Sequence, residues 1–562
     1  MRRLLFCVLV MMSSSGFAAD YYVHASNGSD RNQGTSPEQA WKSLRALEKV
    51  TLQPGDRVLL ARGERFHGNI ELVDVAATET NPVVISSYAE GADESQPKPI
   101  VEAKGRNAGV LILDSRYIEI SNLQIEADGG GFPAHAKANK RKLGKRSLKP
   151  RRVGIYVVAL GREESGYIRI DNVDVREVYA NNQGFVRSYK DTVSSNGEEE
   201  YGFGMFFASV PGAVLNHISV SNSSVSNVSH TGMKFHGKGE INYVQVLDNQ
   251  VLNSGGPGMQ MSGVTKALVR GNTVNGSGSP LDKRNWSRGS GMWTWGSSDI
   301  IVERNQFLNA NGPGDSAGFH IDFNCKNIIV QYNLSANNAG GFIEVLGNNY
   351  NNTYRYNVSV NDGHRVKKPG VAFQEGKTFW LSGFVGSDKS GKKPRPKKRH
   401  GPYNTYIYNN TIFVDDHITA KIAVTKVAEG ALIANNIFHI VGDSKVVQGD
   451  QYVPENNGDT LNLKNIVFKN NLFLKSDNWP EQVLIQDSAP LIGNAEFSQP
   501  GGLRIADYAP TNTAMVEDRG IDIPRIPGDE NGLIVGLKVE RDILGNPIIG
   551  KPDMGAIEVS TH

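Results

Sequence analysis

The sequence predicts an all-β fold, a parallel β-helix or β-solenoid, and three observations predict it. A β-rich run that ends in asparagine recurs along the chain, as in "IEISN", "ISVSN", "IVERN" and "IVQYN". The runs are spaced by about 25 residues or about twice that, which is short for a helical repeat. Val/Ile alternation and 61 glycines favour strands and turns over helices.

The recurring asparagine marks a corner of each predicted coil. Asparagine tolerates the left-handed backbone that a tight corner needs, and stacked side-chain amides can hydrogen-bond from coil to coil. We therefore assign these asparagines a structural role. They are Asn122, Asn172, Asn222, Asn249, Asn272, Asn305, Asn333, Asn357, Asn410, Asn436 and Asn471.

The first 19 residues, "MRRLLFCVLVMMSSSGFAA", predict a secretory signal peptide. They combine two arginines, an apolar run too short to span a membrane, and small residues at the end. We expect a periplasmic or secreted protein whose residues 20–562 form one β-helix domain. Cleavage would remove Cys7 and leave Cys325 alone, so we expect no internal disulfide and a fold held by its core.

Charge is segregated along the chain. Predicted inserts at about 132–152 and 364–402 contain basic runs, with nine Lys/Arg in 137–152 and seven in 389–400, while the rest is acidic. Such runs are often solvated loops, but segregated charge also attracts polyanions. Because the protein is expected to be exported, we predict an anionic polysaccharide partner, no nucleic acid or membrane partner, and a monomer.

The two ends of the chain carry a resemblance. "YYVHASNGSDRNQGTSPEQAWKSLRAL" at the start and "ERDILGNPIIGKPDMGAIE" in a closing segment at about 500–562 resemble the secreted right-handed parallel β-helix proteins of the pectate-lyase-like superfamily. The resemblance implies a right-handed coil, a short N-terminal capping helix, and a polysaccharide lyase, glycoside hydrolase or uronate epimerase. The "NTD", "DD" and "GHG" signatures of polygalacturonases are not found in order, and the calcium-binding pattern of pectate lyases is missing too.

Five segments place a candidate site on one outward face. "GMKFHG", "GMQMSG", "GMWTWG", "GFHIDF" and "GGFIEV" start at Gly232, Gly258, Gly291, Gly318 and Gly340. Their second and fourth residues are mostly apolar and predict the core. Their third and fifth residues predict an outward patch, namely Lys234, His236, Gln260, Ser262, Trp293, Trp295, His320, Asp322, Phe342 and Glu344.

This patch predicts carbohydrate chemistry. Asp322 and Glu344 on neighbouring coils would lie about 5–6 Å apart, as in a retaining glycosidase, whereas His320 or His236 with Lys234 or Tyr403 would suit a lyase. Trp293 and Trp295 would stack on sugars, or else lie buried under the 364–402 insert. We expect further substrate contacts from Gln260, Trp286, Arg288, Glu375 and Lys377.

The function therefore stays open among four classes. A glycoside hydrolase acting on an acidic glycan is slightly favoured, with a lyase, an epimerase or a non-catalytic glycan-binding protein as alternatives. No His/Cys spacing predicts zinc. A loop-bound calcium ion stays possible, and no other cofactor is expected.

Overall fold

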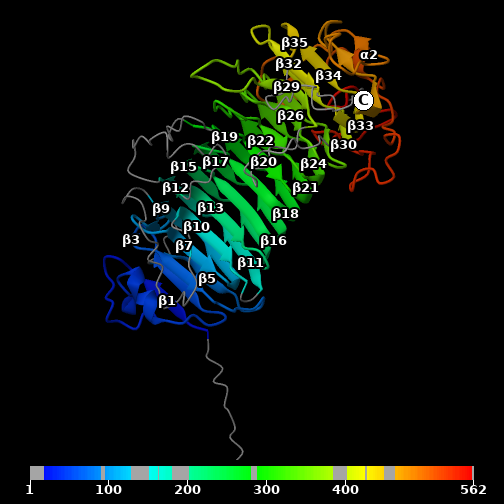
Figure 1. Ribbon diagram of the computed structural model, residues 1–562. Helices are drawn as coiled ribbons and strands as arrows, with labels where there is room; N and C mark the ends of the chain where they lie inside the picture. Colours follow the sequence, from blue (N-terminus) through cyan, green and yellow to red (C-terminus); the bar gives the residue numbers. More distant parts are fainter. Residues whose placement is uncertain are drawn as a thin grey trace, which may run out of the picture.

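The chain forms a right-handed parallel β-helix in the computed structural model (Figure 1). The structure describes residues 18–89, 91, 95–127, 148, 151–161, 164–179, 201–279, 288–383, 401–424, 427–447 and 462–559. Residues 1–17 of the expected signal peptide, most of the first basic insert and residues 384–400 of the second lie outside these ranges. So does Trp286.

In the described part of the chain, strands that recur once per coil form two long parallel sheets. The larger, 24-stranded sheet bends into two faces because β16 (Met233–Leu247) and β18 (Met259–Arg270) run through both. Its first face also contains β4 (Ile70–Val73), β7 (Ala108–Leu113), β10 (Arg152–Ala159), β13 (Tyr201–Ser209), β20 (Met292–Trp295), β23 (Phe319–Ile321), β26 (Gly341–Val345), β29 (Lys377–Leu381), β32 (Ala420–Val424) and β35 (Ser444–Val446).

The remaining strands make the other two faces. The second face contains β1 (Asp20–Val23), β2 (Arg57–Ala61), β5 (Val83–Tyr88), β8 (Arg116–Ser121), β11 (Ser165–Asp171), β14 (Val214–Ser221), β21 (Ser298–Glu303), β24 (Lys326–Gln331), β27 (Thr353–Arg355), β30 (Tyr403–Tyr408), β33 (Val427–Ala434) and β36 (Asn462–Lys469). The third face is the 14-stranded sheet of β3 (Arg65–His67), β6 (Ile100–Glu102), β9 (Gln124–Ala127), β12 (Asp174–Val178), β15 (Ser224–Val228), β17 (Gln250–Ser254), β19 (Thr273–Asn275), β22 (Gln306–Leu308), β25 (Leu334–Ala336), β28 (Val358–Val360), β31 (Thr411–Val414), β34 (Ile437–Ile440), β37 (Leu472–Phe473) and β38 (Leu491–Ile492).

Alternation within each strand builds the core between the faces. On the first face, Met233, Met259, Met292 and Phe319 occupy one inward column and are almost completely buried. The predicted inward positions of these coils are thus confirmed.

The predicted asparagine ladder is present, and it divides into two kinds of position. From Asn249 to Asn471, eight buried amides are linked from one coil to the next by Nδ2–H to Oδ1 hydrogen bonds of 2.9–3.0 Å. In these coils the left-handed residue is the one before the asparagine, such as Arg304 or Tyr332. In the first three coils Asn122, Asn172 and Asn222 themselves have the positive φ.

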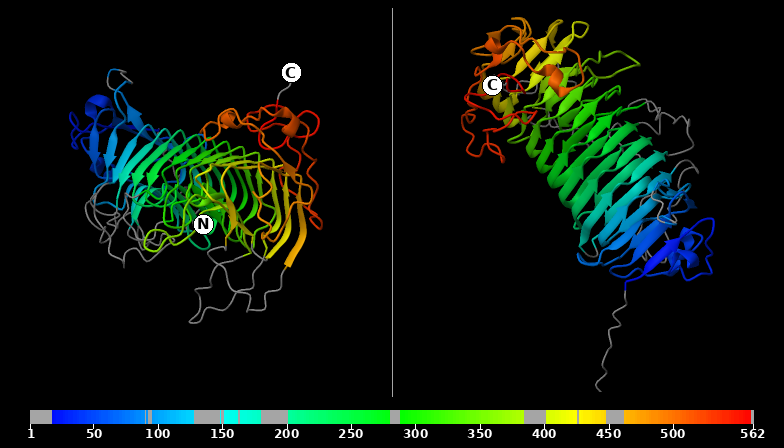
Figure 2. Two further views of the ribbon diagram at one scale, coloured as in Figure 1. Left: turned by 90° about the horizontal axis from the view of Figure 1, so that it is seen from above. Right: turned by 180° about the vertical axis from the view of Figure 1, so that it is seen from behind.

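Short segments cap the two ends. At the N-terminal end, where a short helix is expected, two 3-10 helices run over Pro37–Gln39 and Leu44–Lys49. The closing segment contains the short helices Ile505–Tyr508 and Thr513–Val516 and packs against the outside of the last coils, on the second and third faces (Figure 2). Among the described residues, no helix is long and apolar enough to cross a membrane.

Candidate active site

The outward side chains of the first face meet in one column. Trp293 of β20 is in register with His320 of β23. The bridges Ala317–Gly341 and Ile321–Val345 place Glu344 of β26 beside His320 on the following coil. The column continues to Gln260 and Lys234 in one direction and to Trp380 in the other.

The predicted register is wrong for the last coil by two residues. The sequence alignment pairs Asp322 with Glu344 and His320 with Phe342, whereas Glu344 pairs with His320. The reason is that Phe342 turns inward and packs edge-on against Tyr354 in the core, in the register position that Gly318 fills one coil earlier. Phe342 is thus not part of the outward patch.

The outward column is mostly covered. Lys234, Gln260, His320 and Glu344 are each only 3–6% exposed, so these side chains of the predicted outward patch are largely shielded from solvent. The two tryptophans differ: Trp293 is partly buried and stacks on His320 with ring centroids 5.9 Å apart, whereas Trp295 is 43% exposed. Trp293 is thus stacked and partly buried, and Trp295 is exposed.

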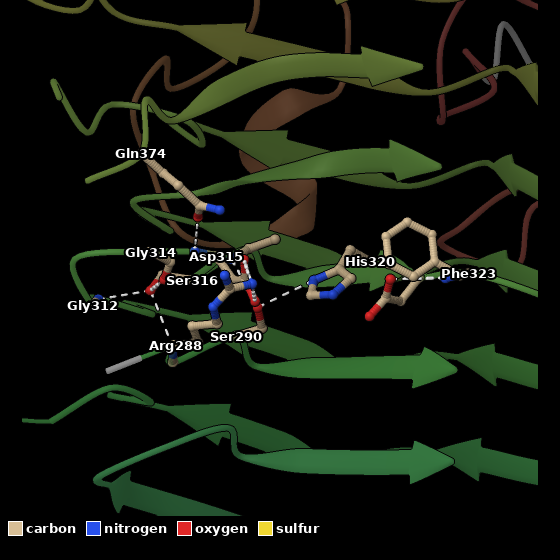
Figure 3. Close-up of polar contacts among 12 residues, drawn as sticks. Arg288, Ser290, Gly312, Gly314, Asp315, Ser316, His320, Phe323 and Gln374 are labelled. Atoms are coloured by element: carbon tan, nitrogen blue, oxygen red, sulfur yellow. Dashed lines mark hydrogen bonds and ion pairs between the residues drawn. The ribbon is translucent and has the colours of Figure 1, made fainter. Parts of the chain in front are cut away.

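An aspartate that the sequence analysis does not single out lies in this site. Asp315 precedes β23, and its carboxylate accepts hydrogen bonds of 3.1 and 3.2 Å from Nη1 of Arg288 (Figure 3). Burial alone would raise the pKa of Asp315, but the charge and hydrogen bonds of Arg288 hold it below its ordinary value. Asp315 is therefore ionised at neutral pH.

His320 lies between Asp315 and Asp322 and is neutral. Burial lowers its pKa to about 4, and the nearby charge of Arg288 acts in the same direction against the opposing effect of Asp315. The imidazole Nδ1 lies 3.2 Å from Oγ of Ser290, which also accepts the N–H of Ala317 at 3.2 Å. The ring is thus fixed by Ser290 on one edge and Trp293 on one face.

Asp322 follows β23 and has the opposite titration behaviour to Asp315. Burial raises its pKa to about 7, the negative charge of Asp315 adds to this, and a 2.8 Å hydrogen bond from the N–H of Phe323 opposes it. Phe323, the next residue, packs with Leu346 and Trp380 in an apolar cluster on the outside of the sheet. A carboxyl group in this environment is about half protonated at neutral pH.

The other predicted site residues lie at different distances from this centre. Lys377 lies over the ring of Trp380, with Nζ 4.0 Å from the ring centroid, and Glu375 accepts the N–H of Lys367 at 2.9 Å. His236 and Lys234 are three coils from His320. Tyr403 stacks on Tyr350 on the second face, away from the column.

A potential metal-binding group lies elsewhere in the described part of the chain. Asp415, Asp416 and His417 bring their ligand atoms within 4.8 Å of one another in the turn between β31 and β32. None of these residues belongs to the column, and Asp416 and His417 are exposed. This group is therefore separate from the candidate site.

Comparison with known proteins relates the chain to carbohydrate enzymes. A family model described as a right-handed β-helix region matches residues 212–383, which include the site. Lacto-N-biosidase of Bifidobacterium longum subsp. longum is 23% identical over 97% of this chain, which spans only 36% of that protein's length. The GH136 lacto-N-biosidase structure from Eubacterium ramulus is 20% identical with a TM-score of 0.49, covering 65% of this chain and 67% of that one.

A second solved structure with some similarity is a polysaccharide lyase. The PL6 family alginate lyase AlyGC is 14% identical with a TM-score of 0.46, covering 93% of this chain and 60% of that one. The chain is a right-handed parallel β-helix protein with distant homology to lacto-N-biosidase, a glycoside hydrolase.

Proposed function

We propose that this protein is a glycoside hydrolase that cleaves a glycan on the first face, with Asp322 and Asp315 as its catalytic pair. The observation that carries the proposal is the opposite titration of these two aspartates on either side of a neutral His320. Glycoside hydrolysis needs one protonated and one ionised carboxyl group, and environments that separate two pKa values supply them. The distant homology to lacto-N-biosidase supports the same reaction class.

The roles follow from the protonation states. Asp322 donates its proton to the glycosidic oxygen as the bond to the anomeric carbon breaks. Asp315, kept ionised by Arg288, either attacks that carbon or activates the water that does. NMR of the first product anomer distinguishes these two courses, because only the covalent route retains the configuration.

Glu344 is the second candidate for the ionised partner. It lies on the coil after Asp322 but two residues earlier in register. With coils about 4.8 Å apart and a rise of about 3.3 Å per residue, the two Cα atoms are about 8 Å apart. Asp315 is preferred because its charge acts on the titration of Asp322, although it lies seven residues away along the chain.

The proposal is tested by three variants. A panel of p-nitrophenyl glycosides, including the lacto-N-bioside, and of natural oligosaccharides is screened for release of nitrophenol or reducing ends. Asp322→Asn and Asp315→Asn should each lower kcat by about 10²–10⁴-fold, and Glu344→Gln should lower it less. Wild-type turnover in both aspartate variants would refute the pair, and loss in Glu344→Gln with an active Asp315→Asn would assign the role to Glu344.

The lyase alternative is tested in the same assays. Elimination produces an unsaturated sugar with ultraviolet absorbance and no net uptake of water. Of the residues expected to act as lyase bases and acids, Lys234 and His236 share one coil that lies three coils from His320, and Tyr403 lies on another face. An increase in ultraviolet absorbance without hydrolysis products would replace the hydrolase proposal with a lyase.

The second part of the proposal is that the glycan is acidic. Basic side chains on the coils that precede the site in the chain support it. Lys234 lies 5.3 and 5.6 Å from the rings of Phe203 and Phe206, and Arg151 lies 4.4 Å from Phe206. The basic runs of the inserts would add to this charge, and the expected leader would export the enzyme to such glycans. Deleting residues 138–150 should raise KM at low salt and flatten its dependence on ionic strength. Parallel salt curves for both forms would favour a neutral glycan.

A further inference from the structure

We infer that Gln374 and Arg365, on the connection between β28 and β29, are positioning residues that hold Asp315 for the reaction. The inference rests on the proposed function, in which Asp315 is the ionised member of the pair. The connection belongs to the coil two turns further along the β-helix. Both residues hydrogen-bond to the backbone of the segment that carries Asp315.

The backbone at Asp315 requires support. Asp315 and Ser316 are two successive non-glycine residues with positive φ, of 42° and 62°. Such a conformation is strained in residues other than glycine and persists only where the surroundings fix it. The Ser316 hydroxyl group provides part of the support, since its Oγ accepts the N–H of Gly312 at 2.8 Å and donates to the carbonyl of Gly314 at 2.7 Å.

Gln374 holds the N–H of Asp315. Its side-chain Oε1 accepts this N–H (Figure 3). The backbone N–H of Gln374 donates to the carbonyl of Pro313 at 3.4 Å. The glutamine is 4% exposed, so water does not readily replace its oxygen. Without this acceptor, the N–H of Asp315 would lose its partner in a strained turn.

Arg365 holds the carbonyl of the same residue. Its Nη1 donates to the carbonyl of Asp315 at 3.0 Å and to that of Gly312 at 2.9 Å. Its Nε donates to the carbonyl of Gln374 at 2.8 Å, so one buried guanidinium joins the connection to the Asp315 segment. Asp315 is therefore tied on both sides of its Cα by residues of the 361–376 connection.

The same connection also supports the partner of the carboxylate. The ring of Phe373 lies 5.5 Å from the guanidinium carbon of Arg288, and it fills the space beside Gly314, where a Cβ atom would meet it. Arg288 in turn fixes both carboxylate oxygens of Asp315. Backbone and carboxylate are thus both set by one connection, which accounts for its buried arginine and glutamine.

The test separates hydrogen bonding from packing. Gln374→Met keeps the size of the side chain and removes the acceptor, whereas Gln374→Glu keeps an acceptor and adds a buried charge. Val366→Ala, at a 64% exposed position on the same connection, is the matched control. The measurements are kcat and KM on the most active glycoside of the panel, the pH-rate profile, thermal unfolding, and hydrogen exchange of peptides covering 309–318.

Gln374→Met should lower kcat about 10–100-fold with KM changed less than about threefold, because a displaced reacting group costs rate rather than binding. Its acidic pH limb should move to higher pH as the Arg288–Asp315 pairing loosens. Gln374→Glu should have a higher kcat than Gln374→Met despite a lower unfolding temperature. A structural role alone would give the opposite order of kcat, following stability, and would overturn the inference.

Hydrogen exchange decides the inference independently of activity. Gln374→Met and Arg365→Lys should increase exchange in 312–316, and Val366→Ala should not. Unchanged exchange in the first two variants overturns the inference. If Asp315→Asn and Asp322→Asn cleave like the wild type, or no glycan is cleaved, the proposed function fails, and the exchange result still shows whether this connection fixes Asp315.

Discussion

Asp315 and Asp322 lie at opposite ends of β23, and their surroundings move the pKa values of the two carboxyl groups in opposite directions. Arg288 pairs with the first aspartate, and an apolar cluster adjoins the second. His320, on the strand between them, stays neutral and so adds no positive charge that would favour ionisation of Asp322. The strand therefore presents a base and an acid at the same pH.

The pH dependence of kcat/KM should reflect this separation. Asp322 must be protonated to act as the acid, so the rate should fall about tenfold per pH unit above about pH 7. Asp315 must be ionised, so the acidic limb should lie below the ordinary aspartate range. A rate that stays flat from pH 6 to about pH 9 would contradict this assignment.

Arg288→Gln provides the control for that profile. Arg288 lowers the pKa of both aspartates, so its removal should shift both limbs to higher pH. Movement of only the acidic limb would mean that Arg288 does not influence Asp322.

The fold could be predicted because the sequence pattern that produces it is repeated along the chain. The same strand pattern recurs in successive coils, and one asparagine marks the corner of each coil. A register inferred from one coil can therefore be checked against the others. The error at Phe342 arises where the repeat is broken: the two glycines at 340 and 341 suggest the same start as Gly318, yet an aromatic side chain enters the core instead.

Asp315 could not be found in this way because it lies outside the repeat. It is in a connection, "GPGDSAG", whose conformation depends on contacts with Gln374 and Arg365, 50 or more residues later. Its spacing from Asp322, on the other side of one short strand, is the signal that the sequence did offer. The burial of Lys234, Gln260 and Glu344 likewise does not follow from strand alternation, which places all three on the outward face.

The two tryptophans should respond differently to removal. Trp295→Ala should weaken glycan binding by about 1–3 kcal/mol, by analogy with aromatic stacking on nucleobases, and leave stability nearly unchanged because the indole is exposed. Trp293→Ala should weaken binding and also lower the free energy of unfolding, because its ring packs on His320. Calorimetric titration and urea unfolding of both variants check this. Equal stability losses would contradict the difference in exposure.

The buried amide ladder should be more important for stability than the exposed corners. Asn333→Ala removes hydrogen bonds to the carbonyls of Val302 and Gln331 and to Asn357, and it removes the Oδ1 that accepts the backbone N–H and one side-chain N–H of Asn305. The free energy of unfolding should fall by about 2–4 kcal/mol.

Asn222→Gly is the matched control for the ladder. Asn222 is exposed and has a φ of 48°, which glycine adopts without strain. Its unfolding free energy should change by less than about 1 kcal/mol. A similar loss in both variants would show that corner geometry, rather than the amide chain, determines stability.

His439 should make the closing segment sensitive to acid. The imidazole is 6% exposed and lies between the rings of Phe413 and Phe497, at centroid distances of 5.5 and 4.9 Å. Burial lowers its pKa to about 4, from an ordinary value of 6.5. Its Nδ1 has no hydrogen-bond partner among the described residues, so the protonated ring would lie buried without compensation.

The direction of this pH effect depends on whether the folded or the unfolded protein protonates His439 at the higher pH. As pH falls below 6.5 the unfolded chain protonates at His439 while the folded protein does not, so stability falls until about pH 4 and then levels off. Between pH 7 and pH 4.5 the free energy of unfolding should therefore fall by roughly 1–3 kcal/mol less in His439→Leu than in the wild type. Urea unfolding at the two pH values measures this difference, and hydrogen exchange should place the acid-induced opening in 490–510. Equal losses in both proteins would show that other groups, such as His320, account for the acid sensitivity.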